Sequence, residues 1–245
     1  MHANLKKKYG QNFLIDKNIV NKIIKIISLR NINILEIGPG DGRLTKEIIN
    51  KKPLQLKIVE IDKDLIKDLI LKFSKYQFVE IVNDNILDLE IQNKFDLVIS
   101  NLPYNISSQI LVKLVLLKHA PNKLILMFQK EFGQRLLEKK INALNSLIRC
   151  FYKIEFCFNV SKNSFKPVPK VESSVLIFHK KDKKLLSNNE IDNFIKFKRY
   201  LFSHKRKSLR NLLKKYKLDD KFDLSLRVED LELSTLLKIF RNINF

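Results

Sequence analysis

The chain has 245 residues, of which 47 are Lys or Arg and 26 are Asp or Glu, so its formal net charge is +21. Hydrophobic residues make up 45% of it, and it has only 5 Gly and 6 Pro, a composition that supports a buried core and excludes a disordered, collagen-like or linker sequence. So large a positive charge indicates a polyanionic partner, with nucleic acid favoured over an anionic membrane surface.

Cysteine and histidine give no sign of a disulfide framework or a metal site. Cys150 and Cys157 are too few and wrongly spaced for either, and the four histidines are scattered. The lysines at 6–8 are not followed by an apolar segment, and no window approaches the roughly 18 apolar residues of a membrane span. We therefore expect a cytoplasmic protein without a bound metal. No dimer seam is evident, so we expect a monomer.

Short β-rich apolar runs alternate with amphipathic stretches between about residues 32 and 180, a pattern typical of a parallel sheet covered by helices. The predicted strands are 32–37, 56–61, 77–82, 95–100, 123–128, 151–158 and 173–179. The predicted helices are 17–29, 43–51, 63–73, 107–118, 130–140 and 142–149. Since no helix is predicted between the last two strands, we expect an antiparallel hairpin at that edge.

The character of the chain changes after about residue 182, where strand patterns stop and a helical period continues. We therefore predict two domains, an α/β domain over 1–182 and a small helical domain over 183–245. Residues 196–217 contain ten Lys or Arg and no acid. A solvated face is the plain interpretation, but a run of one sign favours phosphate binding. The candidate RNA-binding residues are Lys205, Arg206, Lys207 and Arg210.

The first predicted strand ends in "EIGPGDG", which places Gly38, Gly40 and Gly42 in the turn before a helix. Glycines there let the backbone turn sharply and approach a ligand closely. The dinucleotide fingerprint requires a third glycine where this chain has Arg43, so nicotinamide binding is disfavoured. No lysine follows in the pattern of a phosphate-binding loop either.

Two acids follow at the ends of the next two strands. Glu60 could accept hydrogen bonds from both hydroxyls of a ribose, and Asp84 could accept one from an adenine amino group. Either carboxylate alone could be an ordinary strand-end group in solvent. The glycine turn and both acids in this order fit the adenosine half of S-adenosyl-L-methionine.

The fourth strand runs into "NLPY", Asn101 to Tyr104. An adenine amino group is a poor nucleophile, because its lone pair is delocalised into the ring. Two acceptors beside the nitrogen would localise the lone pair: the Asn101 side chain and the Leu102 carbonyl, whose geometry Pro103 restricts. Tyr104 would stack on a base flipped out of its strand. These residues predict an adenine amino-methyltransferase.

Eight segments in order resemble one known family, the bacterial small-subunit ribosomal RNA adenine dimethyltransferases. They are "KKYGQNFLID" at 7–16, "EIGPGDGRLT" at 36–45, "VEID" at 59–62, "NLPYNISS" at 101–108, "QKEFGQRL" at 129–136, "FKPVPKVESSV" at 165–175, "FSHKRKSLRNLL" at 202–213 and "LRVEDLEL" at 226–233. The resemblance covers nearly the whole chain. It implies a Rossmann-like methyltransferase fold with a mostly parallel seven-stranded sheet.

The resemblance implies an activity: methyl transfer from S-adenosyl-L-methionine to two adjacent adenosines in a 3′-terminal hairpin loop of 16S rRNA, within an immature small subunit. The cofactor-binding residues that it implies are Asn12, Leu14, Gly38, Glu60, Asp84 and Asn101. Gly40 belongs to the same turn. Phe165 resembles the family aromatic that stacks on the target base opposite Tyr104.

Two features depart from the family pattern. Ser161 and Lys162 stand where the family usually has two prolines, and the loop around 139–145 is short. Three alternatives stay open: a large-subunit (23S) rRNA methyltransferase of the macrolide-resistance type, a non-catalytic small-subunit assembly factor and a DNA adenine methyltransferase. "HKRKSLRN" and "RVEDLEL" favour the small-subunit enzyme over the first, and the intact "NLPY" disfavours the second. The third is disfavoured because no segment of the chain resembles a module that reads a DNA sequence.

Overall fold

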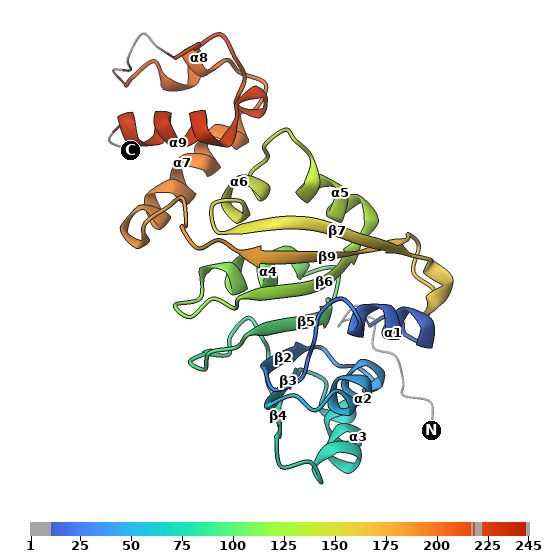
Figure 1. Ribbon diagram of the computed structural model, residues 1–245. Helices are drawn as coiled ribbons and strands as arrows, with labels where there is room; N and C mark the ends of the chain where they lie inside the picture. The colour runs from blue at the N-terminus through green and yellow to red at the C-terminus, as the bar shows by residue number, and fades with distance from the viewer. Residues whose placement is uncertain (1–10, 217, 219–221, 244–245) are drawn as a thin grey trace. The chain divides into compact units, whose positions relative to one another are not determined.

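The computed structural model describes residues 11–216, 218 and 222–243 (Figure 1). A seven-stranded sheet forms its centre, in the order β4-β3-β2-β5-β6-β9-β7. The strands are β2 (Asn33–Ile37), β3 (Gln55–Glu60), β4 (Val79–Asn83), β5 (Leu97–Asn101), β6 (Lys123–Gln129), β7 (Tyr152–Val160) and β9 (Ser173–Lys180). Neighbouring pairs from β4 to β6 are parallel, and β9 is antiparallel to β6. The expected mostly parallel seven-stranded sheet is confirmed.

The last two strands also pair as expected. Ser174 donates a hydrogen bond from its hydroxyl to Asn159 Oδ1 at 2.8 Å, and His179 Nε2 lies 3.8 Å from Glu155 Oε2. From Ser174 to His179 the residue number rises along β9, whereas the partner on β7 falls from Asn159 to Glu155. The two neighbouring strands are therefore antiparallel.

Helices follow the strands in the alternation that the periodicity predicts. They are α1 (Lys17–Ile24), α2 (Arg43–Asn50), α3 (Lys63–Phe73), α4 (Ser107–Leu116), α5 (Lys130–Leu137) and α6 (Asn145–Ile148). The largest differences are at α1, which ends five residues early, and at α6, which is a single turn. Asp16 begins α1, since its carboxylate accepts hydrogen bonds from the Asn18 and Ile19 amides. Asp62 begins α3 in the same way, through the Asp64 amide.

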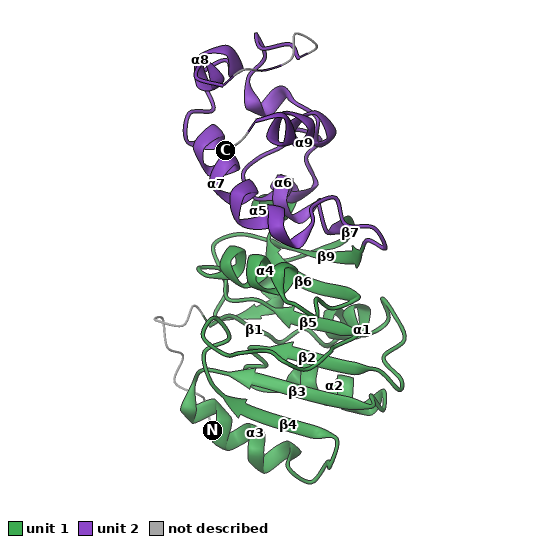
Figure 2. Cartoon of the chain, turned by 90° about the vertical axis from the view of Figure 1, so that its left-hand side faces the viewer, with its two compact units in different colours: residues 1–133, 153–180 green, residues 134–152, 181–245 purple. Residues whose placement is uncertain are grey.

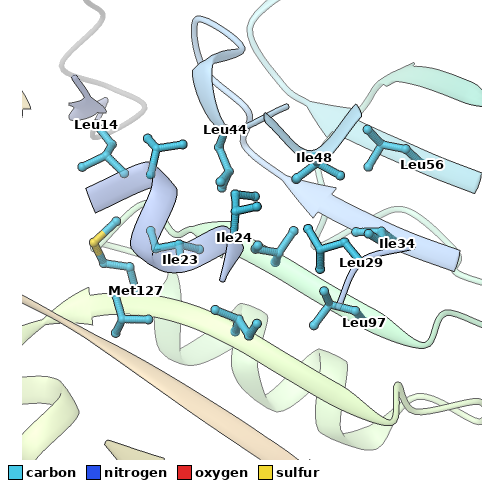
Figure 3. Close-up of a cluster of buried hydrophobic side chains, with 14 of the residues drawn as sticks. Leu14, Ile23, Ile24, Leu29, Ile34, Leu44, Ile48, Leu56, Leu97 and Met127 are labelled. Carbon is cyan, nitrogen blue, oxygen red and sulfur yellow. The ribbon is translucent and has the colours of Figure 1, made fainter. Parts of the chain in front are cut away.

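The main core lies between the sheet and the first three helices, and α4 lies on the other side of the sheet from α1 (Figure 1). The side chains of this core alternate along the strands, as a sheet requires. Figure 3 shows part of the cluster: Leu14, Ile23, Ile24, Leu29, Ile34, Leu44, Ile48, Leu56, Leu97 and Met127. The intervening residues Leu35, Val98 and Leu124 are equally buried, so both faces of the sheet are covered.

A second, two-stranded sheet joins β1 (Phe13–Leu14) to β8 (Phe165–Lys166) in antiparallel register, with Leu14 opposite Phe165. The Ile15 amide extends this contact by donating to the Ser164 carbonyl at 2.8 Å. The pairing brings the segment before the first helix against a segment about 150 residues later. No periodic pattern marks two-residue strands, so the sequence did not predict them.

The chain divides into two compact units, one of residues 1–133 and 153–180 and the other of 134–152 and 181–245 (Figure 2). The second unit therefore includes residues 134–152, which the sequence-based boundary at 182 assigns to the first domain. The short loop at 139–145 belongs to this unit. Two asparagine side chains stabilise the loop. Asn142 Oδ1 accepts hydrogen bonds from the backbone N–H groups of Leu144 and Asn145, and Asn145 Nδ2 donates to the Lys140 carbonyl.

The basic run of the second unit is not one continuous helix. Helix α7 (Ile191–Ser203) ends before Lys205, and α8 (Leu209–Leu213) begins after a turn. The reason is tertiary: the Leu209 and Arg210 amides, at the start of α8, donate to the Leu226 and Leu224 carbonyls at 2.9 and 2.8 Å. Helix α9 (Leu233–Asn242) packs Phe240 against Phe194 and Phe197 of α7, with ring centroids 5.2 and 5.4 Å apart.

Candidate active site

A crevice opens at the carboxyl ends of the parallel strands, beside the point where β2 lies between β3 and β5 and the strand order reverses. Its lining residues come from segments 11–14, 36–41, 43–44, 59–61, 84–86 and 101–103, together with Leu65 and Ile106. The cofactor residues that the sequence singled out all lie on this lining: Asn12, Leu14, Gly38, Gly40, Glu60, Asp84 and Asn101. Leu102 and Pro103 line it as well.

The glycine turn shapes one wall of the crevice. Gly38 and Gly40 have φ of +62° and +61°, a conformation that side chains disfavour. A Cβ on Gly38 would meet no atom within 4 Å, so the turn leaves open space there for a ligand. A Cβ on Gly40 would lie 2.8 Å from the Phe13 ring, which explains why the turn and β1 approach so closely.

Glu60 ends β3 with its carboxylate buried but hydrogen-bonded to the backbone. Oε2 accepts from the Gly40 amide at 3.3 Å, and Oε1 accepts from the Asp62 amide at 2.9 Å. Burial raises the pKa of Glu60, the charge of Asp62 adds to this, and the backbone hydrogen bonds oppose it. Each oxygen accepts a backbone hydrogen bond, and a carboxylate oxygen can accept more than one, which suits the two hydroxyls of a ribose.

Asp84 begins a compact turn after β4. Its amide donates to the Glu60 carbonyl at 3.1 Å, and its own Oδ1 accepts from the Asn85 amide at 2.7 Å. Ile86, in the same turn, is buried and lines the crevice, and the exposed Ile61 lines it from the end of β3. The turn thus offers a carboxylate and apolar surface together, the combination that a purine ring requires.

Asn101 is the last residue of β5. Its Nδ2 donates to the Asn12 carbonyl at 2.8 Å, which leaves Oδ1 as the accepting end of the amide. Among the described residues, this buried Oδ1 has no hydrogen-bond partner. An unpaired buried acceptor costs free energy, and here it lies on the crevice lining beside Leu102 and Pro103. The site therefore has an acceptor ready for a donor on a ligand.

Tyr104 and Phe165 occupy different environments. The Tyr104 hydroxyl lies 2.6 Å from Ser173 Oγ, and burial raises the pKa of this tyrosine, while the Ser173 hydrogen bond lowers it. Phe165 is 1% exposed and belongs to the core cluster with Leu14. The structure thus keeps its ring away from solvent, and the stacking role of Phe165 stays a prediction. In place of the family's two prolines, Ser161 caps the short helical turn before it by accepting from the Asn163 amide.

Glu36 is a crevice residue that the sequence analysis did not single out. It is 1% exposed, and neither carboxylate oxygen has a partner among the described residues. Burial raises its pKa to about 8, the charge of Glu60 adds to this, and the neighbouring Thr45 hydroxyl opposes it. A charged residue inside the apolar run "INILEI" was the available signal. A cation in the crevice would stabilise its charged form.

The four candidate RNA-binding residues lie in the second unit. Lys205, Arg206 and Lys207 form the turn between α7 and α8, Arg210 is in α8, and all four are exposed. Within the described ranges, no cluster of three or more His, Cys, Asp or Glu could hold a metal ion. In the same ranges, no helix has the length and apolarity to cross a membrane.

These features fit S-adenosyl-L-methionine: a glycine turn with open space at Gly38, a buried carboxylate at Glu60 and unpaired buried acceptors at Glu36 and Asn101. The fold and the site together define an S-adenosyl-L-methionine-dependent methyltransferase. The chain belongs to the ribosomal RNA adenine dimethylase family, whose model matches residues 2–241. It is therefore an rRNA adenine dimethyltransferase.

Curated relatives match along almost their whole length. A protein of Mycoplasmopsis synoviae is 36% identical, over 100% of this chain and 99% of its own, and one of Pelagibacter ubique is 35% identical, over 98% and 97%. Both are named ribosomal RNA small subunit methyltransferase A. Among solved structures, a dimethyladenosine transferase of Plasmodium falciparum is similar at 25% identity and a TM-score of 0.80, over 93% of this chain and 95% of that one. The 23S rRNA methyltransferase ErmE shares the fold, with a TM-score of 0.76 at 24% identity, over 96% of this chain and 100% of that one.

Proposed function

We propose that this enzyme dimethylates the exocyclic amino groups of two adjacent adenosines in a 3′-terminal hairpin loop of 16S rRNA, within an immature small subunit. The unpaired Asn101 Oδ1 on the crevice lining carries the chemical part of this proposal. The name of the relatives that match over nearly their full length supports the choice of subunit. The enzyme is proposed to act as a monomer in the cytoplasm.

The residues of the 101–104 motif localise the lone pair of the adenine nitrogen. In the first transfer Asn101 Oδ1 accepts one N–H of the amino group and the Leu102 carbonyl accepts the other; in the second transfer the one remaining N–H donates to one of these two acceptors. As these bonds form, the nitrogen becomes pyramidal and its lone pair leaves the ring, which makes it a nucleophile. After each transfer the methylated nitrogen releases one proton to solvent. Pro103 restricts the backbone that presents the carbonyl. Tyr104 supports the base by stacking, and Phe165 is the candidate for its other face.

The crevice binds the methyl donor through residues from several segments of the chain. Glu60 takes the ribose hydroxyls, Asp84 takes the adenine amino group, and Gly38 and Gly40 allow close approach of the backbone. Asn12 and Leu14 close the crevice from the N-terminal side. When bound, S-adenosyl-L-methionine supplies a methyl group on a positively charged sulfur. This sulfur is a good leaving group, because it becomes a neutral thioether, so the reaction requires no strong base.

The basic turn supplies the proposed contact to RNA. Lys205, Arg206, Lys207 and Arg210 are exposed together and carry a charge that suits phosphates. They contribute affinity but read no base, because phosphate contacts carry no direct sequence information.

A methyl-transfer assay with labelled S-adenosyl-L-methionine tests the proposal. The substrates are small subunits from cells that lack this modification, with unmodified large subunits as the control, and the labelled nucleoside is identified. Dimethyladenosine on the small subunit alone is the expected result. Label on the large subunit would assign the enzyme to 23S rRNA, and tight binding to the small subunit without label would leave an assembly factor.

A further inference from the structure

Lys113 connects two walls of the crevice. It lies in the last turn of α4, and its Nζ donates to the Leu87 and Leu89 carbonyls, both at 2.7 Å. Those carbonyls end the turn that begins at Asp84, whereas α4 follows directly from the segment that contains Asn101. One ammonium group thus joins the adenine side of the crevice to the helix behind the methyl-transfer motif.

The turn at 84–89 makes few other hydrogen bonds to the rest of the protein. The Asp88 and Leu89 amides donate to the Asn85 carbonyl at 2.9 Å each, and the Asn85 side chain bonds Asp88 Oδ2 and the Leu87 amide. All these hydrogen bonds stay within residues 84–89, and residue 84 itself bonds β3. Among the described residues, Lys113 provides the hydrogen bonds from the far end of this turn to another element.

The other end of the connection is rigid. Four residues of α4, Ile110, Leu111, Leu114 and Val115, are at most 2% exposed, so the helix is anchored in the core. Carbonyls at the end of a single helical turn have no partner inside the turn, and a lysine satisfies such groups well. A charged donor also makes stronger hydrogen bonds than a neutral one. Lys113 therefore holds the turn against a fixed support.

We infer that Lys113 is a positioning residue for the methyl donor: it holds the 84–89 turn so that Asp84 and Ile86 present the adenine-binding wall. The inference rests on the proposed binding of S-adenosyl-L-methionine in this crevice. Lys113 touches neither the donor nor the target base. Its loss should weaken donor binding while leaving the chemistry at Asn101 intact once the donor is saturating.

The test is the Lys113→Met variant, with donor binding measured by calorimetry in the absence of RNA. We expect the Kd for S-adenosyl-L-methionine and for S-adenosylhomocysteine to rise by about tenfold or more, because two charge-assisted hydrogen bonds are lost. The KM for the donor should rise in parallel, with kcat nearly unchanged. Lys113→Arg, which keeps a cationic donor, should restore most of the affinity, and Lys113→Gln is a second variant with the same expected loss.

Lys180 provides the matched control. Its Nζ also donates to a backbone carbonyl, that of Ala120 at 2.8 Å, at the opposite end of the sheet from the crevice. Lys180→Met therefore makes the same change of charge and removes the same kind of contact, and its Kd should equal that of the parent. Equal Kd values for the Met variants at 113 and 180 would overturn the inference, as would a fall in kcat at saturating donor without a change in Kd. Failure to methylate small subunits would count against the proposed target but leave this binding result unaffected.

Discussion

Asn101 has one amide group with two tasks. Nδ2 donates to the Asn12 carbonyl at 2.8 Å, and Oδ1, which has no partner among the described residues, is proposed to accept from the target amino group. Asn101→Ala should lower kcat by about 100-fold or more, the usual cost of removing one such transition-state acceptor or donor. Binding of unmodified small subunits should stay near normal. Single-turnover transfer and a filter-binding assay measure the two quantities, with the exposed Asn50→Ala as control.

If transfer and RNA binding fell to the same extent, Asn101 would be a structural residue and its role in the chemistry would be wrong.

Glu36 makes stability depend on pH. Its pKa is about 8 in the folded chain, against about 4.5 for an ordinary glutamate. Between these values the folded state keeps a proton that the unfolded state has lost, so this residue lowers the free energy of unfolding by about 1.4 kcal/mol per pH unit as pH rises. Its contribution to stability is fully present below pH 4.5 and is lost as pH rises through about 8.

Glu36→Gln should therefore stabilise the protein without bound donor at pH 8, with a gain that shrinks toward pH 5. Urea unfolding at several pH values measures this, and Glu131→Gln on the exposed face of α5 is the control. If the gain in the free energy of unfolding were the same at every pH, or absent at pH 8, the conclusion that Glu36 is buried and protonated would be wrong.

At the scale of elements, the contact between β1 and β8 depends on Asp16. Its Oδ1 caps α1, and its Oδ2 accepts from the Ser164 hydroxyl at 3.0 Å, next to Phe165. Asp16→Ala should lower the free energy of unfolding by about 1–2 kcal/mol, the usual cost of a lost N-cap. It should also weaken donor binding, because Phe13 and Leu14 of β1 line the crevice and Asp16 helps to hold this strand against β8.

The pH dependence of this cap has the opposite sign to that of Glu36. Partial burial works to raise the pKa of Asp16, but the hydrogen bonds from Ser164 and the α1 amides outweigh it and lower the pKa below 3.8. The stabilisation is therefore present above pH 3.8 and is lost on acidification through the lower folded-state value. Urea unfolding of Asp16→Ala beside the exposed Asp68→Ala measures the cap. Equal stability of the two variants would show that the cap contributes nothing.

At the scale of the whole molecule, we expect charge to determine how the protein binds RNA. Replacing Lys205, Arg206, Lys207 and Arg210 by Gln should weaken binding to small subunits and flatten its salt dependence. Each lost phosphate contact should reduce the slope of log K against log salt by about 0.7 to 0.9. Binding measured from low to moderate salt gives the slope.

A second variant separates local contacts from net charge. It removes the same number of positive charges from the exposed lysines of the first unit, at Lys46, Lys51, Lys67 and Lys75. The basic-turn variant should lose the larger part of the slope. If both variants lost equally, the turn would be a solvated face and the RNA contact would lie elsewhere.

Local patterns were enough for the fold class, the order of strands and helices and most of the crevice. Strand and helix periods are local, and the carboxyl ends of neighbouring parallel strands meet at one edge, so the glycine turn, Glu60 and Asp84 could be brought together from spacing. The cofactor contacts of Asn12, Leu14 and Asn101 were implied by the family resemblance. The "NLPY" motif predicted the chemistry in the same way, against the alternative of an ordinary turn after a strand.

Contacts between distant residues needed the folded chain. Asn101 is joined to Asn12 across 89 positions, and Lys113 reaches a turn more than 20 positions away. Burial likewise follows from packing of the whole domain: it gives Glu36 its protonated state and puts Phe165 in the core. No period or spacing encodes which side chain fills a given space, since that depends on elements that meet only after folding.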